Sequence, residues 1–400
     1  MPIDLDKELA AVDGAFSRGD NLHGLQLLRA LALRAGSPDL LHRLAVVEEQ
    51  IGDSRAALAA HLRCLGNAPA NPHAYLYAGY CLWSNGFESE ALEVFSLGAD
   101  LEPGLLCPKT LRAEPGARAT RRRHCAELLR RHFSELHRRS VGNEAALSRI
   151  RRSIWVQTDS TQAAVLDAGP QRPHLFFIPE LSPIAWYNSA DFPWARELLD
   201  EAPVIAEEFE QALDRISAHG RPYLPVSSAT KEAFPALAGS LNWTALDIYR
   251  DGVLNEQLAE HLPATHVALS KIPLYGLTDG APYEVFFSLL RPGQRIDPHY
   301  GLSNHSLTVH LPILVPDNCR LTVAGESRPW RSGELMIFDD TFLHDAVNGS
   351  GEDRVVLIFS VWNPQLNKQE RDAVTRSFAA RQSWLERRGI PDSARFQDIE

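Results

Sequence analysis

The sequence predicts an α+β protein in which an N-terminal α-helical repeat precedes a β-rich domain. Two observations support this prediction. A helical pattern recurs every 33 or 34 residues in the first third of the chain, and short apolar strands separated by turn residues fill the second half. A chain of 400 residues is also longer than a single hydrophobic core usually accommodates, which favours two domains. We therefore expect a helical repeat at residues 1–110, a helical connector at 111–168 and the β-rich domain at 169–400.

Composition and charge narrow the class of protein. Hydrophobic residues make up 44% of the chain and charged residues 23%, as in an ordinary globular protein. The net charge of −11 argues against a nucleic-acid binder, because such a surface needs clustered positive charge. The arginine-rich run at residues 118–139 is a local exception that fits a solvated or interdomain face.

Cysteine usage and the N-terminus indicate the compartment. The five cysteines form no Cys-X-X-Cys pair, so the sequence predicts neither a zinc knuckle nor a disulfide framework. The N-terminus is acidic and lacks the apolar core of a signal peptide, and no apolar run is long enough to span a bilayer. We expect a cytoplasmic protein with no membrane and no nucleic acid among its partners.

Three glycines mark the period of the N-terminal repeat. Gly19, Gly52 and Gly86 each follow one apolar helical stretch and precede another. Glycine ends a helix in a tight turn, and the small Ala57 and Ala91, at matching positions, allow close packing of the second helix. The pattern resembles the tetratricopeptide repeat, and a plain helical bundle is the alternative. Stacked helix pairs of this kind form a surface that holds a peptide or a protein partner.

The second half of the chain carries the strands. Many short strands at close spacing favour a sandwich or a barrel. Thr308, His310 and Pro312 alternate with apolar residues, so one face of their strand is polar and can line a cavity. Helices are expected at residues 193–216 and 367–387. The expected strands are 174–179, 242–250, 285–290, 306–314, 320–323, 334–338 and 354–362.

Two histidines and an arginine stand at strand ends in this domain. His299 follows Arg-Ile-Asp-Pro, His344 follows Phe-Asp-Asp-Thr-Phe-Leu, and Arg354 opens a long apolar strand. Two neutral imidazoles on neighbouring strands can hold one metal ion and leave coordination positions open for substrates. Each of these residues is a weak signal alone, and a purely structural role is the alternative for each.

The joined motifs carry a family resemblance. Pro-Gly-X4-Pro-His at 292–299, Ile-Phe-Asp-Asp-X-Phe-X-His at 337–344, Arg354 and Val-Trp-Asn-Pro at 361–364 resemble the aspartyl/asparaginyl β-hydroxylase family. The resemblance extends over roughly residues 170–375. It implies a double-stranded β-helix of jelly-roll, cupin-like type. It also implies an enzyme, an iron(II)- and 2-oxoglutarate-dependent dioxygenase that consumes O2.

The same resemblance assigns roles to residues. It implies that His299 and His344 are the metal ligands at the catalytic centre. Gly301 stands where most oxygenases of this kind have a carboxylate, and members of this family resemble the chain in having glycine there. Arg354 would bind the distal carboxylate of 2-oxoglutarate, with Ser288 and His310 in support.

Thr308 departs from the family pattern. Family members carry an arginine at this position, so the chain lacks one positive charge near the cosubstrate or the substrate. Either Arg291 or Arg320 supplies this charge, or the substrate differs. The nearby carboxylates are interpreted as turn and strand-end residues rather than as ligands: Asp297, Asp339, Asp340 and Asp345.

The leading hypothesis is hydroxylation of the β-carbon of an aspartyl or asparaginyl residue in a peptide or protein. The helical repeat favours a macromolecular substrate, because its surface can hold an extended chain. One alternative is a small-molecule substrate, such as a free or carrier-bound amino acid or a lipid acyl chain. Another is a non-catalytic binding module, against which the intact His299, His344 and Arg354 argue.

Overall fold

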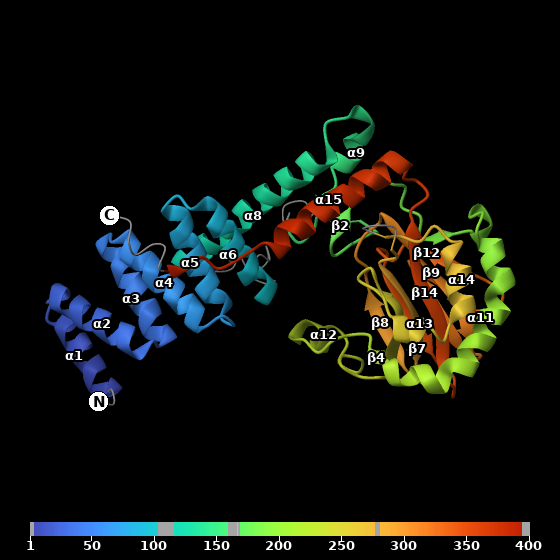
Figure 1. Ribbon diagram of the computed structural model, residues 1–400, viewed down its shortest axis with the longest axis horizontal. Helices are drawn as coiled ribbons and strands as arrows, with labels where there is room; N and C mark the ends of the chain where they lie inside the picture. Colours follow the sequence, from blue (N-terminus) through green and yellow to red (C-terminus); the bar gives the residue numbers. More distant parts are fainter. Residues whose placement is uncertain (1–3, 103–115, 159–165, 167–168, 277–280, 394–400) are drawn as a thin grey trace. The chain divides into compact units, whose positions relative to one another are not determined.

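The computed structural model describes residues 4–102, 116–158, 166, 169–276 and 281–393 (Figure 1). The chain divides into two compact units, Met1–Leu136 with Arg381–Glu400 and His137–Ala380. The expected domain boundaries at 110/111 and 168/169 lie in or beside segments outside the described residues, so they stay predictions. In the described part of the chain, no helix combines the length and the apolar character that crossing a bilayer requires.

Three helix hairpins, α1–α2, α3–α4 and α5–α6, build the first unit. Gly19, Gly52 and Gly86 follow the first helix of each hairpin and have left-handed φ angles of 80°, 84° and 86°, a conformation that glycine adopts without strain. Ala57 and Ala91 are fully buried, as close packing of the second helices requires. The hairpins therefore form as expected, and their assignment to the tetratricopeptide repeat stays a prediction. The helices are α1 (Leu5–Ser17), α2 (Asn21–Ala35), α3 (Pro38–Ile51), α4 (Ser54–Asn67), α5 (Pro72–Ser84), α6 (Glu88–Leu101) and α8 (Ala117–Val141).

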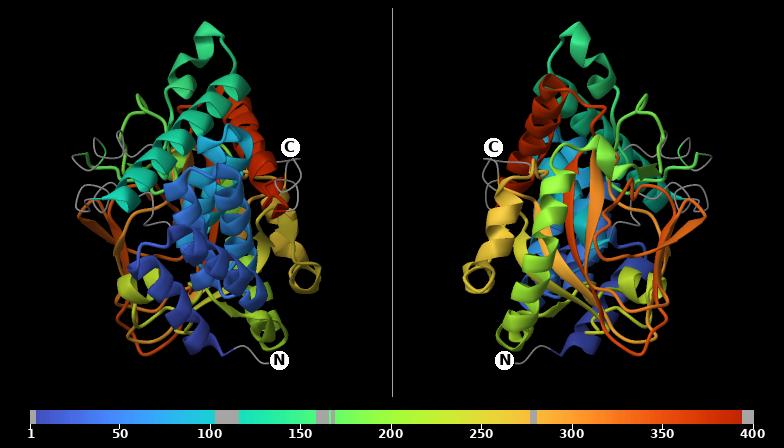
Figure 2. Two further views of the ribbon diagram at one scale, coloured as in Figure 1. Left: turned by 90° about the vertical axis from the view of Figure 1, so that its left-hand side faces the viewer. Right: turned by 90° about the vertical axis from the view of Figure 1, so that its right-hand side faces the viewer.

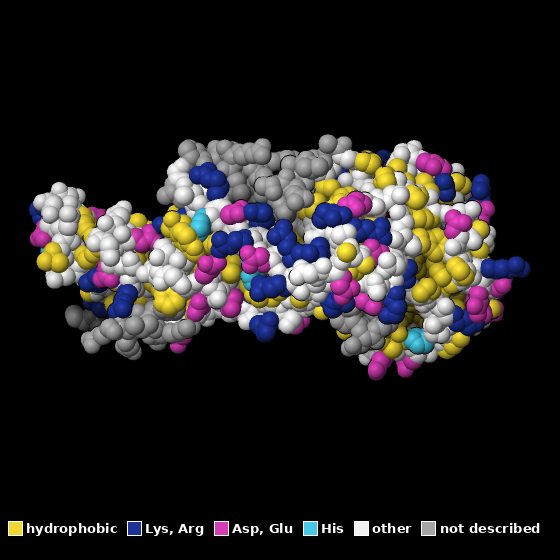
Figure 3. Space-filling view, turned by 90° about the horizontal axis from the view of Figure 1, so that it is seen from above, with side chains coloured by type: hydrophobic (Ala, Val, Ile, Leu, Met, Phe, Trp, Pro, Cys, Tyr) yellow, Lys and Arg dark blue, Asp and Glu magenta, His cyan; other side chains and the backbone are white. Residues whose placement is uncertain are grey.

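The arginine-rich run forms helix α8, and its N-terminal half packs on α3 and α5. Arg121 donates from Nη2 to Oε2 of Glu49 over 2.6 Å, and its guanidinium lies 4.3 Å from the ring centroid of Tyr77. Another arginine of the run, Arg131, pairs with Glu88. On the face of the molecule drawn in Figure 3, Lys and Arg side chains are interspersed with Asp and Glu. The run is thus a partly ion-paired helix face rather than one block of unpaired charge.

Two sheets form the core of the second unit. The larger sheet has the order β3-β12-β9-β14-β7-β5-β4, with β6 paired to β5, and the smaller has the order β11-β10-β13-β8. From β7 to β14 the chain passes repeatedly between the two sheets, a pattern that fits the expected jelly roll. The strands are β3 (Trp186–Tyr187), β4 (Arg221–Pro222), β5 (Trp243–Arg250), β6 (Val253–Leu254), β7 (Glu284–Leu290), β8 (Arg295–His299), β9 (Ser306–Leu314), β10 (Cys319–Val323), β11 (Glu326–Pro329), β12 (Met336–Phe338), β13 (His344–Asn348) and β14 (Arg354–Trp362).

Strand alternation divides the larger sheet into two faces. Outward residues such as Val309, Leu357 and Phe287 pack under helices α11 and α14, and Figure 2 shows α11 lying along the long strands. Inward residues such as Val356 and Leu290 pack against the smaller sheet. Because side chains alternate along a strand, this parity directs His310, Ser288 and Arg354 inward as well. The remaining elements of this unit are α9 (Ser148–Arg151), β1 (Ile154–Trp155), β2 (Phe176–Phe177), α11 (Ala195–Ile216), α12 (Ser228–Ala233), α13 (Glu256–Ala259), α14 (Pro263–Ser270) and α15 (Lys368–Glu386), whose last residues belong to the first unit.

Candidate active site

Strand pairing brings the two predicted histidines together. His299 ends β8, His344 begins the antiparallel β13, and the two residues are direct partners in the ladder. Their ring centroids lie 4.1 Å apart. The register shifts just after His344, a β-bulge of the kind that redirects side chains next to functional sites. Two residues separated by 45 positions in the sequence therefore present their imidazoles side by side.

The backbone fixes the tautomer of both rings. Nδ1 of His299 lies 2.8 Å from the carbonyl oxygen of Asp297, and Nδ1 of His344 lies 3.0 Å from that of Phe342. A carbonyl only accepts hydrogen bonds, so Nδ1 carries the proton and Nε2 keeps its lone pair. Burial, with the neighbouring His344, lowers the pKa of His299 to about 4, and burial also lowers the pKa of His344. Both rings are therefore neutral near pH 7, as metal ligands must be.

Gly301 faces a carboxylate. A Cβ atom at this position would lie 2.1 Å from Oδ1 of Asp340, so only glycine fits. The amide of Gly301 donates to the Asp340 carbonyl over 2.6 Å, and Oγ1 of Thr308 donates to Oδ2 of Asp340 over 3.1 Å. Burial raises the pKa of the Asp340 carboxyl to about 6. The side chain of residue 340 thus fills the space that a side chain at 301 would need.

Protein metal ligands beyond the two histidines are not evident. Across the described ranges, no group of three or more His, Cys, Asp or Glu side chains has the geometry to hold a metal ion. The donor set that the site offers is therefore a pair of neutral imidazoles, and Asp340 stands beside Gly301 without completing a three-residue set.

Arg354 lies deep in the inward face. It is 1% exposed, and its Nη1 donates to the carbonyl of Ser288 over 3.4 Å. Its guanidinium lies 4.9 Å from the ring centroid of Trp330, and its Nε has no hydrogen-bond partner among the described residues. Burial lowers the pKa of Arg354 to about 10, so it stays charged at neutral pH. A buried cation with an unfilled donor can bind an anion.

Two further inward residues have a donor to offer. Nδ1 of His310 accepts from Nε1 of Trp330 over 3.3 Å, and burial together with the Arg354 charge lowers the pKa of His310, so its remaining proton is on Nε2. Oγ of Ser288 accepts from Nε1 of Trp243 over 3.0 Å, which leaves the hydroxyl hydrogen to donate elsewhere. His310, Ser288 and Arg354 can therefore all donate to one bound anion.

The inward residues adjoin the histidine pair. The ring of Phe338 lies 5.1 Å from that of His310 and 5.8 Å from that of His344. The other two arginines considered for this region lie elsewhere. Arg291 is paired with Asp353, and Arg320 is on the exposed face of β10. The five predicted site residues thus gather in one unit, while neither candidate replacement for the missing arginine joins them.

Other site residues carry no local sequence signal. Trp330 and Trp243 orient His310 and Ser288, and Gln171 donates to Asp339 from a position 168 residues away. A tryptophan or a glutamine is unremarkable in a sequence until the fold brings it against its partner.

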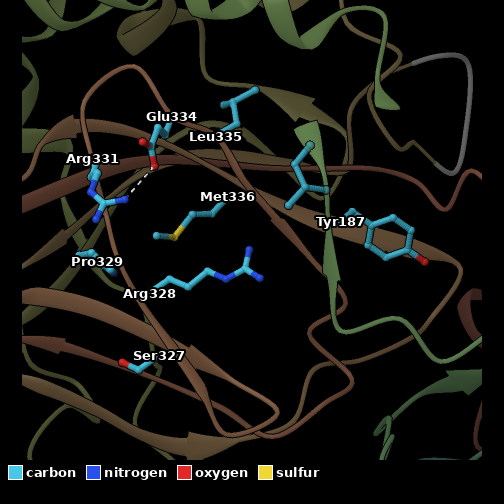
Figure 4. Close-up of a pocket in the computed structure, with 9 residues that line it drawn as sticks. Tyr187, Ser327, Arg328, Pro329, Arg331, Glu334, Leu335 and Met336 are labelled. Atoms are coloured by element: carbon cyan, nitrogen blue, oxygen red, sulfur yellow. Dashed lines mark ion pairs between the residues drawn. The ribbon is translucent and has the colours of Figure 1, made fainter. Parts of the chain in front are cut away.

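A small separate pocket lies along β11 and β12. Its volume is about 150 Å³, and its lining includes Arg328, Arg331 and Glu334, of which the last two form an ion pair at 3.7 Å (Figure 4). Arg328 stacks 4.2 Å from the ring centroid of Trp186. The lining contains none of the five predicted site residues, so we do not assign the chemistry to this pocket.

The β-sheet unit contains the part of the chain that resembles known proteins. Residues 200–364 match the sequence profile of the aspartyl/asparaginyl beta-hydroxylase family. An ornithine lipid ester-linked acyl 2-hydroxylase from Rhizobium tropici is 32% identical over 181 residues, which are 44% of this chain and 60% of that protein. Human aspartyl/asparaginyl beta-hydroxylase is 31% identical over 132 residues, which are 32% of this chain and 17% of that protein.

A third relative is aspartate beta-hydroxylase domain-containing protein 2 from Xenopus tropicalis, 29% identical over 213 residues, or 52% of this chain and 55% of that protein. The chain therefore spans at most about 60% of the length of these three relatives. The matched segment contains both histidines, Arg354 and the motifs around them. Over residues 200–364 the chain is therefore similar to proteins of the aspartyl/asparaginyl β-hydroxylase family.

Proposed function

We propose that the β-sheet unit is an iron(II)- and 2-oxoglutarate-dependent dioxygenase that hydroxylates the β-carbon of an aspartyl or asparaginyl residue in a peptide or protein. The observation that carries this proposal is the juxtaposition of two histidines with free Nε2 lone pairs and a buried arginine with an unfilled donor. Neither feature has an evident structural purpose, whereas a metal ion and an anionic cosubstrate would use both.

The histidine pair fits iron(II). Imidazole suits iron, and a ligand set of two histidines leaves several coordination positions open. The Asp297 and Phe342 carbonyls fix the imidazoles from the outer side, which is the usual arrangement around a ligating histidine. When bound, the iron would supply the oxidation: O2 and 2-oxoglutarate are consumed, a C–H bond becomes C–OH, and succinate and carbon dioxide are released.

The inward polar residues fit 2-oxoglutarate. Arg354 would bind a carboxylate through its free Nε–H, and Ser288 and His310 would donate to the same anion. Trp330 packs against the guanidinium and holds it in place. Because the whole set is buried, these charge-assisted hydrogen bonds would be little weakened by solvent.

The helical unit would help to bind the substrate. Stacked helix hairpins offer a surface for an extended chain, and we propose that this surface takes part in binding a peptide or protein. One relative is named an aspartyl/asparaginyl beta-hydroxylase, a name that denotes hydroxylation of aspartyl or asparaginyl residues.

A second candidate function has a specific observation in its favour. The relative from Rhizobium tropici is named an acyl 2-hydroxylase of an ornithine lipid. Thr308 hydrogen-bonds Asp340, and neither Arg291, which pairs with Asp353, nor the exposed Arg320 replaces the missing charge beside it. The absence of an arginine at position 308 suits an acyl chain or another substrate without a carboxylate, which we keep as the alternative to an aspartyl or asparaginyl residue.

Succinate formation tests the proposal. The purified chain is incubated with iron(II), ascorbate and 2-oxoglutarate, with and without aspartyl peptides or hydroxylatable lipids. We expect succinate from the wild type and less than about 1% of it from His299→Ala and His344→Ala. His219→Ala, which alters an exposed histidine of the same unit, is the matched control and should behave as the wild type. Equal succinate from all four proteins would overturn the site, and a hydroxylated lipid with no hydroxylated peptide would favour the second function.

A further inference from the structure

A short segment outside the family-profile match holds both histidine-bearing loops. Residues 171–176, which we name the clamp segment, precede the matched residues 200–364. The amide of Arg172 donates to the Thr341 carbonyl over 2.8 Å, and the amide of Leu175 donates to the Leu302 carbonyl over 2.9 Å. The amide of His174 donates to the Gly301 carbonyl over 3.1 Å. The clamp segment is thus hydrogen-bonded to the loop after His299 and to the loop before His344.

Gln171 adds a buried side-chain link to one of these loops. Its amide nitrogen donates to Oδ2 of Asp339 over 2.7 Å and to Oγ1 of Thr341 over 3.2 Å. Oδ1 of the same aspartate accepts from the amide and the hydroxyl of Thr341, over 2.9 Å and 2.5 Å. Gln171 is 5% exposed, Asp339 1% and Thr341 0%, so solvent cannot replace these bonds.

The buried network leads directly to a histidine. The amide of Phe342 donates to the Asp339 carbonyl over 3.3 Å, which closes a turn. The carbonyl of Phe342 in turn accepts the proton of Nδ1 of His344. Gln171 therefore fixes the turn that sets the position of this carbonyl, and the carbonyl sets the orientation of the imidazole. Outer partners of ligating histidines usually act through such links.

We propose that Gln171 is a positioning residue of the two-histidine site and that it acts on His344 through Asp339, Thr341 and the Phe342 carbonyl. This inference rests on the proposed function, because it assumes that His344 binds a metal ion. It extends the site beyond the matched family segment to residue 171. A purely structural role for Gln171 would lower the stability of the unit and leave the metal site unchanged.

Asn348 provides a matched control for this distinction. It lies at the opposite end of β13 from His344 and is fully buried. Its amide donates to the carbonyls of Leu290, Arg291 and Glu352 over 2.8, 3.1 and 2.8 Å. Loss of its hydrogen bonds should therefore destabilise the same strand without reaching the histidine pair.

The test uses cobalt(II) chloride and the full chain. Cobalt(II) affinity and its ligand-field absorption spectrum are measured at 10 °C for the wild type, Gln171→Met and Asn348→Ala, after thermal melts have shown that each is folded there. Methionine keeps the length of glutamine and removes the donor. We expect Gln171→Met to weaken cobalt(II) binding about tenfold and to alter the spectrum. Asn348→Ala should lower Tm and keep affinity and spectrum within twofold of the wild type.

A second variant covers the case in which Gln171→Met does not fold. Thr341→Val removes the hydroxyl that accepts from Gln171 and donates to Oδ1 of Asp339, and it should weaken cobalt(II) binding by a similar factor. Wild-type affinity and spectrum in the folded Gln171 or Thr341 variant would overturn the inference and leave the proposed function standing. The proposed function itself fails if the wild type does not bind cobalt(II), or if His299→Ala and His344→Ala bind it as the wild type does.

Discussion

Gly301 is a position where one added methyl group should destabilise the protein strongly. In Gly301→Ala the new Cβ would lie 2.1 Å from Oδ1, 2.2 Å from Cγ and 2.5 Å from Oδ2 of Asp340, far inside van der Waals contact. The carboxylate must move, which breaks its hydrogen bond with Thr308. Overpacking costs about 1–3 kcal/mol and a lost hydrogen bond to a charged group about 1.5–3 kcal/mol, so we expect a loss of about 3 kcal/mol.

Thermal unfolding measures this loss. For a unit of about 240 residues, 3 kcal/mol corresponds to a decrease in Tm of roughly 6–12 °C. Gly351→Ala is the matched control, because a Cβ atom there meets no atom within 4 Å, and its Tm should stay within about 1 °C of the wild type. The substitution Asp340→Ala should remove the clash, so Gly301→Ala should cost little in that background. Equal Tm values for Gly301→Ala and Gly351→Ala would refute the reasoning.

Three other predictions concern charge and pH. Arg354→Met should weaken 2-oxoglutarate binding about 100-fold in a titration. It should leave Tm of the ligand-free protein unchanged or higher, because it removes a buried charge with an unfilled donor. A large fall in Tm with normal binding would show that the role of Arg354 is structural. Burial, with the neighbouring Asp247, raises the pKa of Glu284 from 4.5 to about 7, so its contribution to stability is complete below about pH 4.5 and is lost as the pH rises through 7. Glu284→Gln should therefore gain about 3 kcal/mol over the wild type at pH 8 relative to pH 4.5 in urea unfolding, and a pH-independent difference would contradict this. Cobalt(II) affinity should fall at a lower pH than the usual histidine pKa of 6.5, because burial lowers the pKa of His344 and lowers that of His299 to about 4. A fall centred near pH 6.5 would argue against the burial of these rings.

Local patterns predicted the parts of this structure that depend on neighbours in sequence. The 33- and 34-residue spacing of Gly19, Gly52 and Gly86 predicted the helix hairpins, because a left-handed turn favours glycine wherever it occurs. The alternation around His310 predicted an inward polar face, because side chains on a strand alternate. The ends of β9 and β14 matched the predicted ranges because both strands are long, mostly apolar and rich in β-branched residues.

Contacts between distant segments could not be predicted in this way. The sequence His-Asp-Ala-Val-Asn of β13 has too few apolar residues to indicate a strand, and it becomes one only by pairing with β8 and β10. The contact of Asp340 with Gly301 and that of Gln171 with Asp339 depend on the same pairing. Arg320 was a candidate for the missing charge because it is near in sequence, but its place in β10 turns it to the exposed face.

Helix α8 has a consequence for any partner of the helical unit. Its Arg121 side chain already occupies the faces of α3 and α5, where it pairs with Glu49 and stacks on Tyr77 and Tyr80. A segment of the same chain competes at a high effective concentration, whereas a free peptide competes only at its own concentration. A peptide that binds these faces must therefore displace α8, which requires tight binding. Partners of this unit are accordingly expected on the helix faces that α8 leaves uncovered.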